Sequence, residues 1–124
     1  VIALEVGPEV LAGSTRLKAG TATKIVLNAL STAAMVRLGK CYGPFMVDVI
    51  ATNTKLRARA RRMVETLTGS NSRRANELLD AAGGSVKLAV VMARLDVGKA
   101  EARRRLKNAN GRLRQVLEAR PHRP

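Results

Sequence analysis

Apolar positions recur along most of the chain with the spacing of α-helices. The opening residues 1–6, VIALEV, are apolar and β-branched and end at Gly7 and Pro8, which favours a buried strand. Residues 15–38 carry apolar side chains around most of a helix, so this helix is expected to be buried on several sides in an intact protein. Without protein packed around it, this helix would present an apolar surface prone to aggregation or oligomerisation. Gly39 is its natural end, and KCYGPFM is expected to form a turn.

Shorter helices are expected in the second half of the chain. Asn53 is the predicted N-cap of a helix that runs to about Thr68, with most of its arginines opposite the apolar stripe. The polar residues 68–72, TGSNS, form the best internal boundary. Ala75, Leu78, Leu79 and Ala82 form one apolar face that ends at Gly83 and Gly84. Ser85 and Gly98 are expected to cap two further helices, the first of them central to the bundle, and Gly111 precedes a last segment containing Leu113, Val116 and Leu117.

The composition of the 124-residue chain is sufficient for one folded core. Hydrophobic residues make up 46% of the chain, and its only aromatic residues are Tyr42 and Phe45. Closely packed aliphatic helices are therefore expected. Cys41 is the single cysteine, which excludes an internal disulfide, fits a reducing cytoplasm and favours a buried small hydrophobe over a reactive thiol. His122 has no Cys or His nearby, so no metal site is predicted. Charges interrupt residues 15–38, so no membrane span is predicted.

The net charge of +14 is concentrated in the second half of the chain. Residues 51–124 contain 18 of the 23 basic and 6 of the 9 acidic residues, a balance of +12. Runs such as Arg57, Arg59, Arg61, Arg62 and Arg103, Arg104, Arg105 could contact phosphates, but no aromatics are interleaved for base stacking. Nothing marks one helix as a base-reading helix of a helix-turn-helix. Nucleic-acid binding is therefore expected to be non-specific, and a solvated helix face is the plainer interpretation.

The residues with the clearest binding chemistry lie between the expected strand and the long helix. The stretch GPEVLAGSTRLKAGTATK, residues 7–24, gathers polar groups at this junction. Ser14 is the expected N-cap, and the unpaired amides beside Thr15, Arg16 and Lys18 would form a donor-rich pocket for a phosphate or a sugar hydroxyl. In the plainer alternative, Ser14 and Thr15 only cap the helix while Arg16 and Lys18 are solvated.

This same stretch resembles the signature shared by N-acetylmuramic acid 6-phosphate etherases and glucokinase regulatory proteins. KIVLNALSTAAMVRLGK, MVDVIATNTKLRARA and LLDAAGGSVKLAVVM resemble the etherase branch, in the same order and spacing. The resemblance implies a cytoplasmic, homodimeric lyase of cell-wall recycling, without metal or other cofactor. Its substrate is a phosphorylated amino sugar, and it cleaves the D-lactyl ether to give N-acetylglucosamine 6-phosphate and D-lactate. Glu9, Ser14, Thr15, Arg16 and Lys18 would bind this sugar phosphate.

The resemblance also implies a mainly α architecture that is divided into several segments. Residues 1–50 would be the last strand and long helix of a truncated sugar isomerase (SIS) α/β domain, and residues 51–68 a connecting helix. Residues 69–120 resemble the ubiquitin-associated (UBA) type of helical bundle, and residues 121–124 would be a mobile tail. The family's two catalytic glutamates and serine-rich loop are expected outside this chain, so no catalytic residue is assigned. The alternatives are a sugar-phosphate-binding regulatory or assembly module, as in glucokinase regulatory proteins, and a basic nucleic-acid-binding helical domain.

Overall fold

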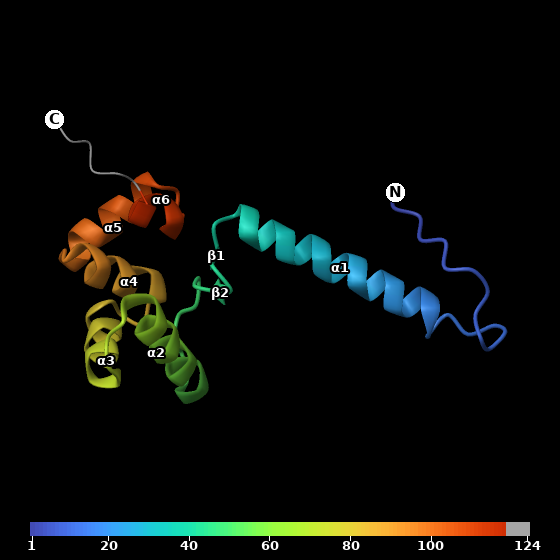
Figure 1. Ribbon diagram of the computed structural model, residues 1–124, viewed down its shortest axis with the longest axis horizontal. Helices are drawn as coiled ribbons and strands as arrows, with labels where there is room; N and C mark the ends of the chain where they lie inside the picture. The colour runs from blue at the N-terminus through green and yellow to red at the C-terminus, as the bar shows by residue number, and fades with distance from the viewer. Residues whose placement is uncertain (119–124) are drawn as a thin grey trace. The chain divides into compact units, whose positions relative to one another are not determined.

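A computed structural model describes residues 1–118 and divides the chain into two compact units between Arg37 and Leu38. His122 and the predicted tail at 121–124 lie outside the described residues. The elements are α1 (Lys18–Arg37), β1 (Cys41–Tyr42), β2 (Phe45–Met46), α2 (Thr54–Thr68), α3 (Ser72–Ala81), α4 (Val86–Leu95), α5 (Lys99–Asn108) and α6 (Leu113–Glu118), as Figure 1 shows. The prediction of a mainly α-helical chain is confirmed.

The first unit contains one long helix and no strand. Residues 1–6 form no strand, so this prediction is wrong for the chain as it stands. A strand is defined by hydrogen bonds to a neighbouring strand, and the first unit offers none. The helix is present but begins at Lys18 instead of residue 15.

None of the residues of α1 is buried. Its large apolar side chains include Ile25, Leu27 and Leu30, each more than half exposed. The apolar pattern of this helix was expected to require burial on several sides, and the first unit does not provide it. Among the described residues, no helix has both the length and the apolar character needed to cross a membrane.

The segment KCYGPFM forms a tight antiparallel hairpin in which Cys41 pairs with Met46 and Tyr42 with Phe45. Gly43 adopts a φ of 55° at the first turn position, where two-residue hairpin turns require a positive φ. Tyr42 and Phe45 pack against the hydrophobic core, and Val47 just beyond is only 1% exposed. The expected turn is therefore confirmed, and it belongs to the second unit.

Gly39 lies at the start of the hairpin in a left-handed conformation, with a φ of 70°. A Cβ atom at this position would come within 2.6 Å of Cγ of Arg112, which precedes α6. Both the backbone angle and the close approach therefore require glycine here.

The caps predicted for the bundle helices are confirmed. The side chain of Asn53 accepts a hydrogen bond from the Leu56 amide, and Ser85 accepts one from the Leu88 amide, so each caps the helix that follows. Gly98 is the N-cap of α5 without a side-chain hydrogen bond. Gly69 ends α2 with a φ of 73°, in the left-handed conformation typical of helix C-termini.

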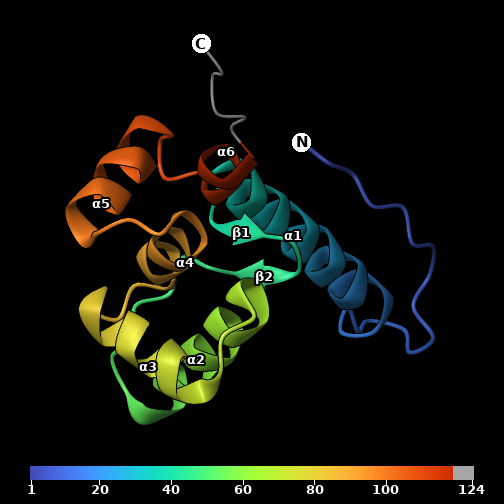
Figure 2. The same ribbon diagram turned by 60° about the vertical axis from the view of Figure 1, so that its left-hand side comes forward.

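The helix α4 is the centre of the second unit. It packs against α2 and α3 on one side and α5 and α6 on the other, as both Figure 1 and Figure 2 show. Its Val86, Ala89, Val90 and Val91 are all fully buried. The other helices contribute the remaining aliphatic core, which includes Ala60, Met63, Val64, Ala75, Leu78, Leu79, Ala82, Ala102, Leu106, Leu113 and Val116. The predicted central position of this helix and the predicted apolar face of α3 are confirmed.

Candidate functional site

The signature residues form a closed loop before α1. Both carboxylate oxygens of Glu9 accept backbone hydrogen bonds of 3.0 Å, one from the Lys18 amide and one from the Ala19 amide. The ammonium group of Lys18 donates to the Pro8 carbonyl at 2.9 Å. Glu9 therefore occupies the position at the helix N-terminus where Ser14 was predicted, and the prediction of Ser14 as N-cap is wrong.

The start of α1 stabilises the ionised form of the Glu9 carboxyl. The hydrogen bonds from Ala19 and Lys18 hold the pKa of the Glu9 carboxyl below its ordinary value, since they stabilise the ionised form. The N-terminal end of a helix also carries partial positive charge, which favours an anion. In this structure the anion at the start of α1 is the chain's own carboxylate.

Acid is expected to fray the first turn of α1. Because the folded-state pKa of Glu9 is lowered, its stabilisation is present above the unfolded-state pKa and is lost as the pH falls through the folded-state pKa. Amide chemical shifts of Lys18 and Ala19, followed by NMR from neutral pH downward, should report this loss. Glu9→Gln should abolish the titration at both amides. A titration that persists in the variant would assign it to another acid.

The remaining signature residues are placed differently. The Thr15 carbonyl accepts a hydrogen bond of 2.9 Å from the Gly20 amide, and a Cβ on Gly20 would lie 3.2 Å from that carbonyl oxygen. The Ser14 hydroxyl oxygen lies 3.5 Å from the Arg16 amide. Among the described residues, the exposed Arg16 side chain has no hydrogen-bond or ion-pair partner. Unlike Lys18, whose ammonium group is bonded to the Pro8 carbonyl, Arg16 is therefore available to an external anion.

In the bundle, many cations pair with neighbouring carboxylates, some of them sharing one carboxylate. Arg73 and Arg74 pair with Glu77, and Arg104 and Arg105 pair with Glu101. Lys40 and Lys87 both pair with Asp48. Partial burial raises the pKa of the Asp48 carboxyl, but hydrogen bonds from the two lysines outweigh this and hold it below its ordinary value.

One flank of α2 carries cations without such partners. We call Lys55, Arg59 and Arg62 the α2 stripe; all three are exposed and, among the described residues, none has a carboxylate partner. Positions four and three residues apart share a helix flank, and the stripe covers about 10 Å of helix. The stripe borders a surface hollow of about 650 Å³, which Asn53, Leu56 and Ala58 also line. A small anionic ligand with an uncharged portion suits this combination of free cations and a partly apolar lining.

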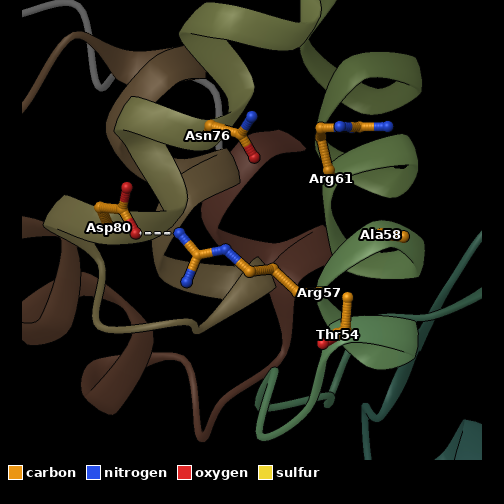
Figure 3. A pocket seen from close by; sticks show the side chains of 6 residues that line it. All are labelled: Thr54, Arg57, Ala58, Arg61, Asn76 and Asp80. Carbon is orange, nitrogen blue, oxygen red and sulfur yellow. Dashed lines mark hydrogen bonds and ion pairs between the residues drawn. The ribbon is translucent and has the colours of Figure 1, made fainter.

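A second hollow lies between α2 and α3 and has different electrostatics. It measures about 370 Å³ and is lined by Thr54, Arg57, Ala58, Arg61, Asn76 and Asp80. Figure 3 shows Arg57 reaching across from α2 to form an ion pair with Asp80, while the side chain of Arg61 extends away from α3. Arg61 pairs with Glu65 on its own helix. The charged side chains that line this hollow are all in ion pairs. The pair between Arg57 and Asp80 links α2 to α3, and the hollow has no unpaired charge among its lining residues to bind a charged ligand.

No metal centre accompanies these groups in the described part of the chain. Among residues 1–118, no three His, Cys, Asp or Glu side chains come together in a way that could hold a metal ion. The features described so far that could bind a small anionic ligand are the signature loop with Arg16 and the α2 stripe.

Comparison with known proteins gives close relatives, three of which are etherases from different bacteria. The chain is 58% identical over 116 residues to the N-acetylmuramic acid 6-phosphate etherase of Deinococcus radiodurans, with 94% of this chain and 38% of that protein covered. The etherase of Rubrobacter xylanophilus is 61% identical over 112 residues, covering 90% and 36%. That of Geobacillus thermodenitrificans is 53% identical over 117 residues, covering 94% and 40%. No family model matches the chain.

These relatives are etherases, so this basic, mainly helical chain is related to that class of enzymes. The chain is homologous to the C-terminal part of N-acetylmuramic acid 6-phosphate etherases, so the family resemblance stated from the signature is confirmed. The chain spans about two fifths of the length of these relatives.

Proposed function

We propose that this chain acts as part of a cytoplasmic lyase that cleaves the D-lactyl ether of N-acetylmuramic acid 6-phosphate. The products would be N-acetylglucosamine 6-phosphate and D-lactate, formed by elimination followed by addition of water. The observation that carries the proposal is identity of 53–61% to curated etherases over at least 90% of this chain. Identity at this level over such a length supports a shared binding role far better than an isolated motif does.

The role of this chain within the enzyme would be to bind the phosphorylated sugar. In the signature loop, Arg16 has a guanidinium free to form a bidentate contact with a phosphate, and Ser14 and Thr15, which precede it in the sequence, each carry a hydroxyl that would bind the ligand. The carboxylate of Glu9 closes the loop at the start of α1 and would shape the pocket through the backbone. Lys18 would do the same through its bond to the Pro8 carbonyl.

The α2 stripe, which lies in the second unit, is a separate candidate for binding the sugar phosphate. Three exposed cations without carboxylate partners, beside a hollow with Leu56 and Ala58 in its lining, suit the phosphate and the carbon skeleton of a sugar phosphate. The acid and the base of the reaction would come from outside this chain, and no metal or other cofactor is proposed.

The exposed long helix supports a proposal about assembly. We place the first unit, residues 1–37, at the end of an SIS-type domain and the second unit in the role of a UBA-like domain of a homodimeric enzyme. The bound at residue 50 expected from the sequence is moved because the hairpin packs against the core of the second unit. What supports this is α1, a helix apolar on most sides that has no buried residue within this chain. Such a helix gains stability from further protein packed around it.

Arg16→Ala in an intact etherase that contains this chain tests the binding role. We expect the apparent affinity for the sugar phosphate to fall about tenfold or more, since a charge-assisted hydrogen bond contributes roughly 1.5–3 kcal/mol. Steady-state kinetics with N-acetylmuramic acid 6-phosphate would measure kcat and KM. Lys24→Ala, a charge change farther along α1, is the matched control. Unchanged turnover and affinity in Arg16→Ala would remove Arg16 from the site.

A further inference from the structure

The helix α5 concentrates positive charge on the surface of the bundle. Its sequence KAEARRRLKN contains a single acid, Glu101, which is shared by Arg104 and Arg105 at 2.7 Å each. Glu101 is thereby fully engaged, and the hydrogen bonds from Arg105 and Arg104 hold the pKa of its carboxyl below its ordinary value. Internal pairing therefore leaves the other cations of this helix without a counter-charge.

These remaining cations are Lys99, Arg103 and Lys107, which we call the α5 stripe. All three are exposed, and none has an ion-pair partner among the described residues. Their spacing of four residues places them along one flank over about 12 Å of helix, while Ala102 and Leu106 face the core. Unlike the α2 stripe, they line neither of the two hollows described above. An exposed row of cations outside a hollow suits an extended polyanion better than a small ligand.

The surroundings of the α5 stripe narrow the class of partner. Among the described residues, every exposed large hydrophobic side chain lies within residues 1–38 or at Ile50, so α5 presents none. Protein interfaces take most of their energy from buried aromatic and aliphatic anchors, and membrane-surface helices insert apolar side chains; α5 has neither. It also has no aromatic side chain on which unpaired bases could stack. Contact with the phosphates of a duplex requires only charge, which this row of exposed cations supplies.

We propose that the α5 stripe binds the phosphate backbone of duplex nucleic acid without sequence preference. Lys99, Arg103 and Lys107 would each neutralise a phosphate and release its counterion. This binding is independent of the etherase chemistry and uses none of the residues assigned to the sugar phosphate. Its failure would leave the proposed function unaffected.

The test is the salt dependence of binding to a fluorescein-labelled DNA duplex, measured by anisotropy with the 124-residue chain. Arg103→Gln/Lys107→Gln should reduce the magnitude of the slope of log K against log salt by about 2, because each lost phosphate contact contributes about 0.9. The control is Arg73→Gln/Arg74→Gln, which removes the same charge from arginines that already pair with Glu77. It should leave the slope nearly unchanged. Circular dichroism would check that both variants remain folded.

Several outcomes would overturn the proposal. Equal loss of slope in the two double variants would mean that overall charge, and not the α5 stripe, sets binding. An equal loss from Lys55→Gln/Arg59→Gln would contradict the assignment to α5. Binding to vesicles of phosphatidylserine and phosphatidylcholine that depends more strongly on Arg103 and Lys107 than duplex binding does would assign the stripe to a membrane surface instead.

Discussion

Replacing Leu79 by alanine is expected to lower the free energy of unfolding of the helical bundle by about 2–5 kcal/mol, the range for truncating a buried leucine. Leu79 is only 1% exposed and is among the largest fully buried side chains of the core. The change removes apolar contacts and leaves a cavity between α3 and its neighbours. Urea unfolding followed by circular dichroism would measure the difference. A small bundle has a total stability of only about 5–15 kcal/mol, so a large part of it is at stake.

The same chemical change on the long helix provides the control. Leu30 on α1 is 53% exposed, so Leu30→Ala should change the free energy of unfolding of the bundle by less than about 0.5 kcal/mol. The comparison separates burial from side-chain chemistry, because both variants lose the same atoms. A cost for Leu30→Ala as large as that for Leu79→Ala would show that α1 contributes to the core of the bundle.

Removing two cations of the α2 stripe is expected to impair sugar-phosphate binding more than any single substitution in the signature loop. In an intact etherase that contains this chain, Lys55→Gln/Arg59→Gln should raise KM for N-acetylmuramic acid 6-phosphate by about a hundredfold or more. Each charge-assisted hydrogen bond contributes roughly 1.5–3 kcal/mol, and every 1.4 kcal/mol corresponds to a factor of ten. Steady-state kinetics, together with inhibition by inorganic phosphate, would measure the loss.

A matched variant distinguishes contact with the ligand from a general loss of charge. Arg73→Gln/Arg74→Gln also removes two positive charges, but from exposed arginines on α3 that pair with Glu77. We expect its KM to stay within about twofold of the parent enzyme, because long-range charge effects are screened within about 10 Å at moderate salt. If both double variants raised KM equally, the α2 stripe would have no special role in binding.

The helical bundle was predictable from the sequence because its determinants are local. Asn53 and Ser85 cap helices through amides three residues ahead, and the apolar spacing of α3 places Leu78 and Leu79 in the core. Such short-range rules apply wherever a segment folds within its own neighbourhood. The curated relatives independently confirmed the family that the signature suggested.

The start of α1 was not predictable in the same way. Ser14 is of a residue type that is favoured at helix N-caps. The loop before α1 instead folds back so that the Glu9 carboxylate accepts hydrogen bonds from the amides of Lys18 and Ala19. That contact depends on the conformation of the whole loop, which local preferences do not specify. The strand expected at residues 1–6 failed for a related reason, since a strand needs a neighbouring strand to pair with and the first unit has none.

The candidate site could be predicted only in part. The signature identified Arg16 but gave no indication that Glu9 would close the loop. The α2 stripe was included among the arginine runs as a possible nucleic-acid surface, without Lys55. A usable signal was present, because neither Lys55 nor Arg59 has an acid three or four residues away. Arg57, by contrast, pairs with Asp80 through the packing of α2 on α3, which only the fold brings together.

The glycine at position 39 also has a value for recognising related chains. Its left-handed backbone and the 2.6 Å that would separate a Cβ from Arg112 mean that any other residue must displace the segment before α6 from the hairpin. A distant sequence that keeps glycine here, followed by a short hairpin and a later cation at the matching position, can be expected to dock its hairpin in the same manner. Position 39 thus serves as a sequence marker for this arrangement where overall identity has become too low to detect it.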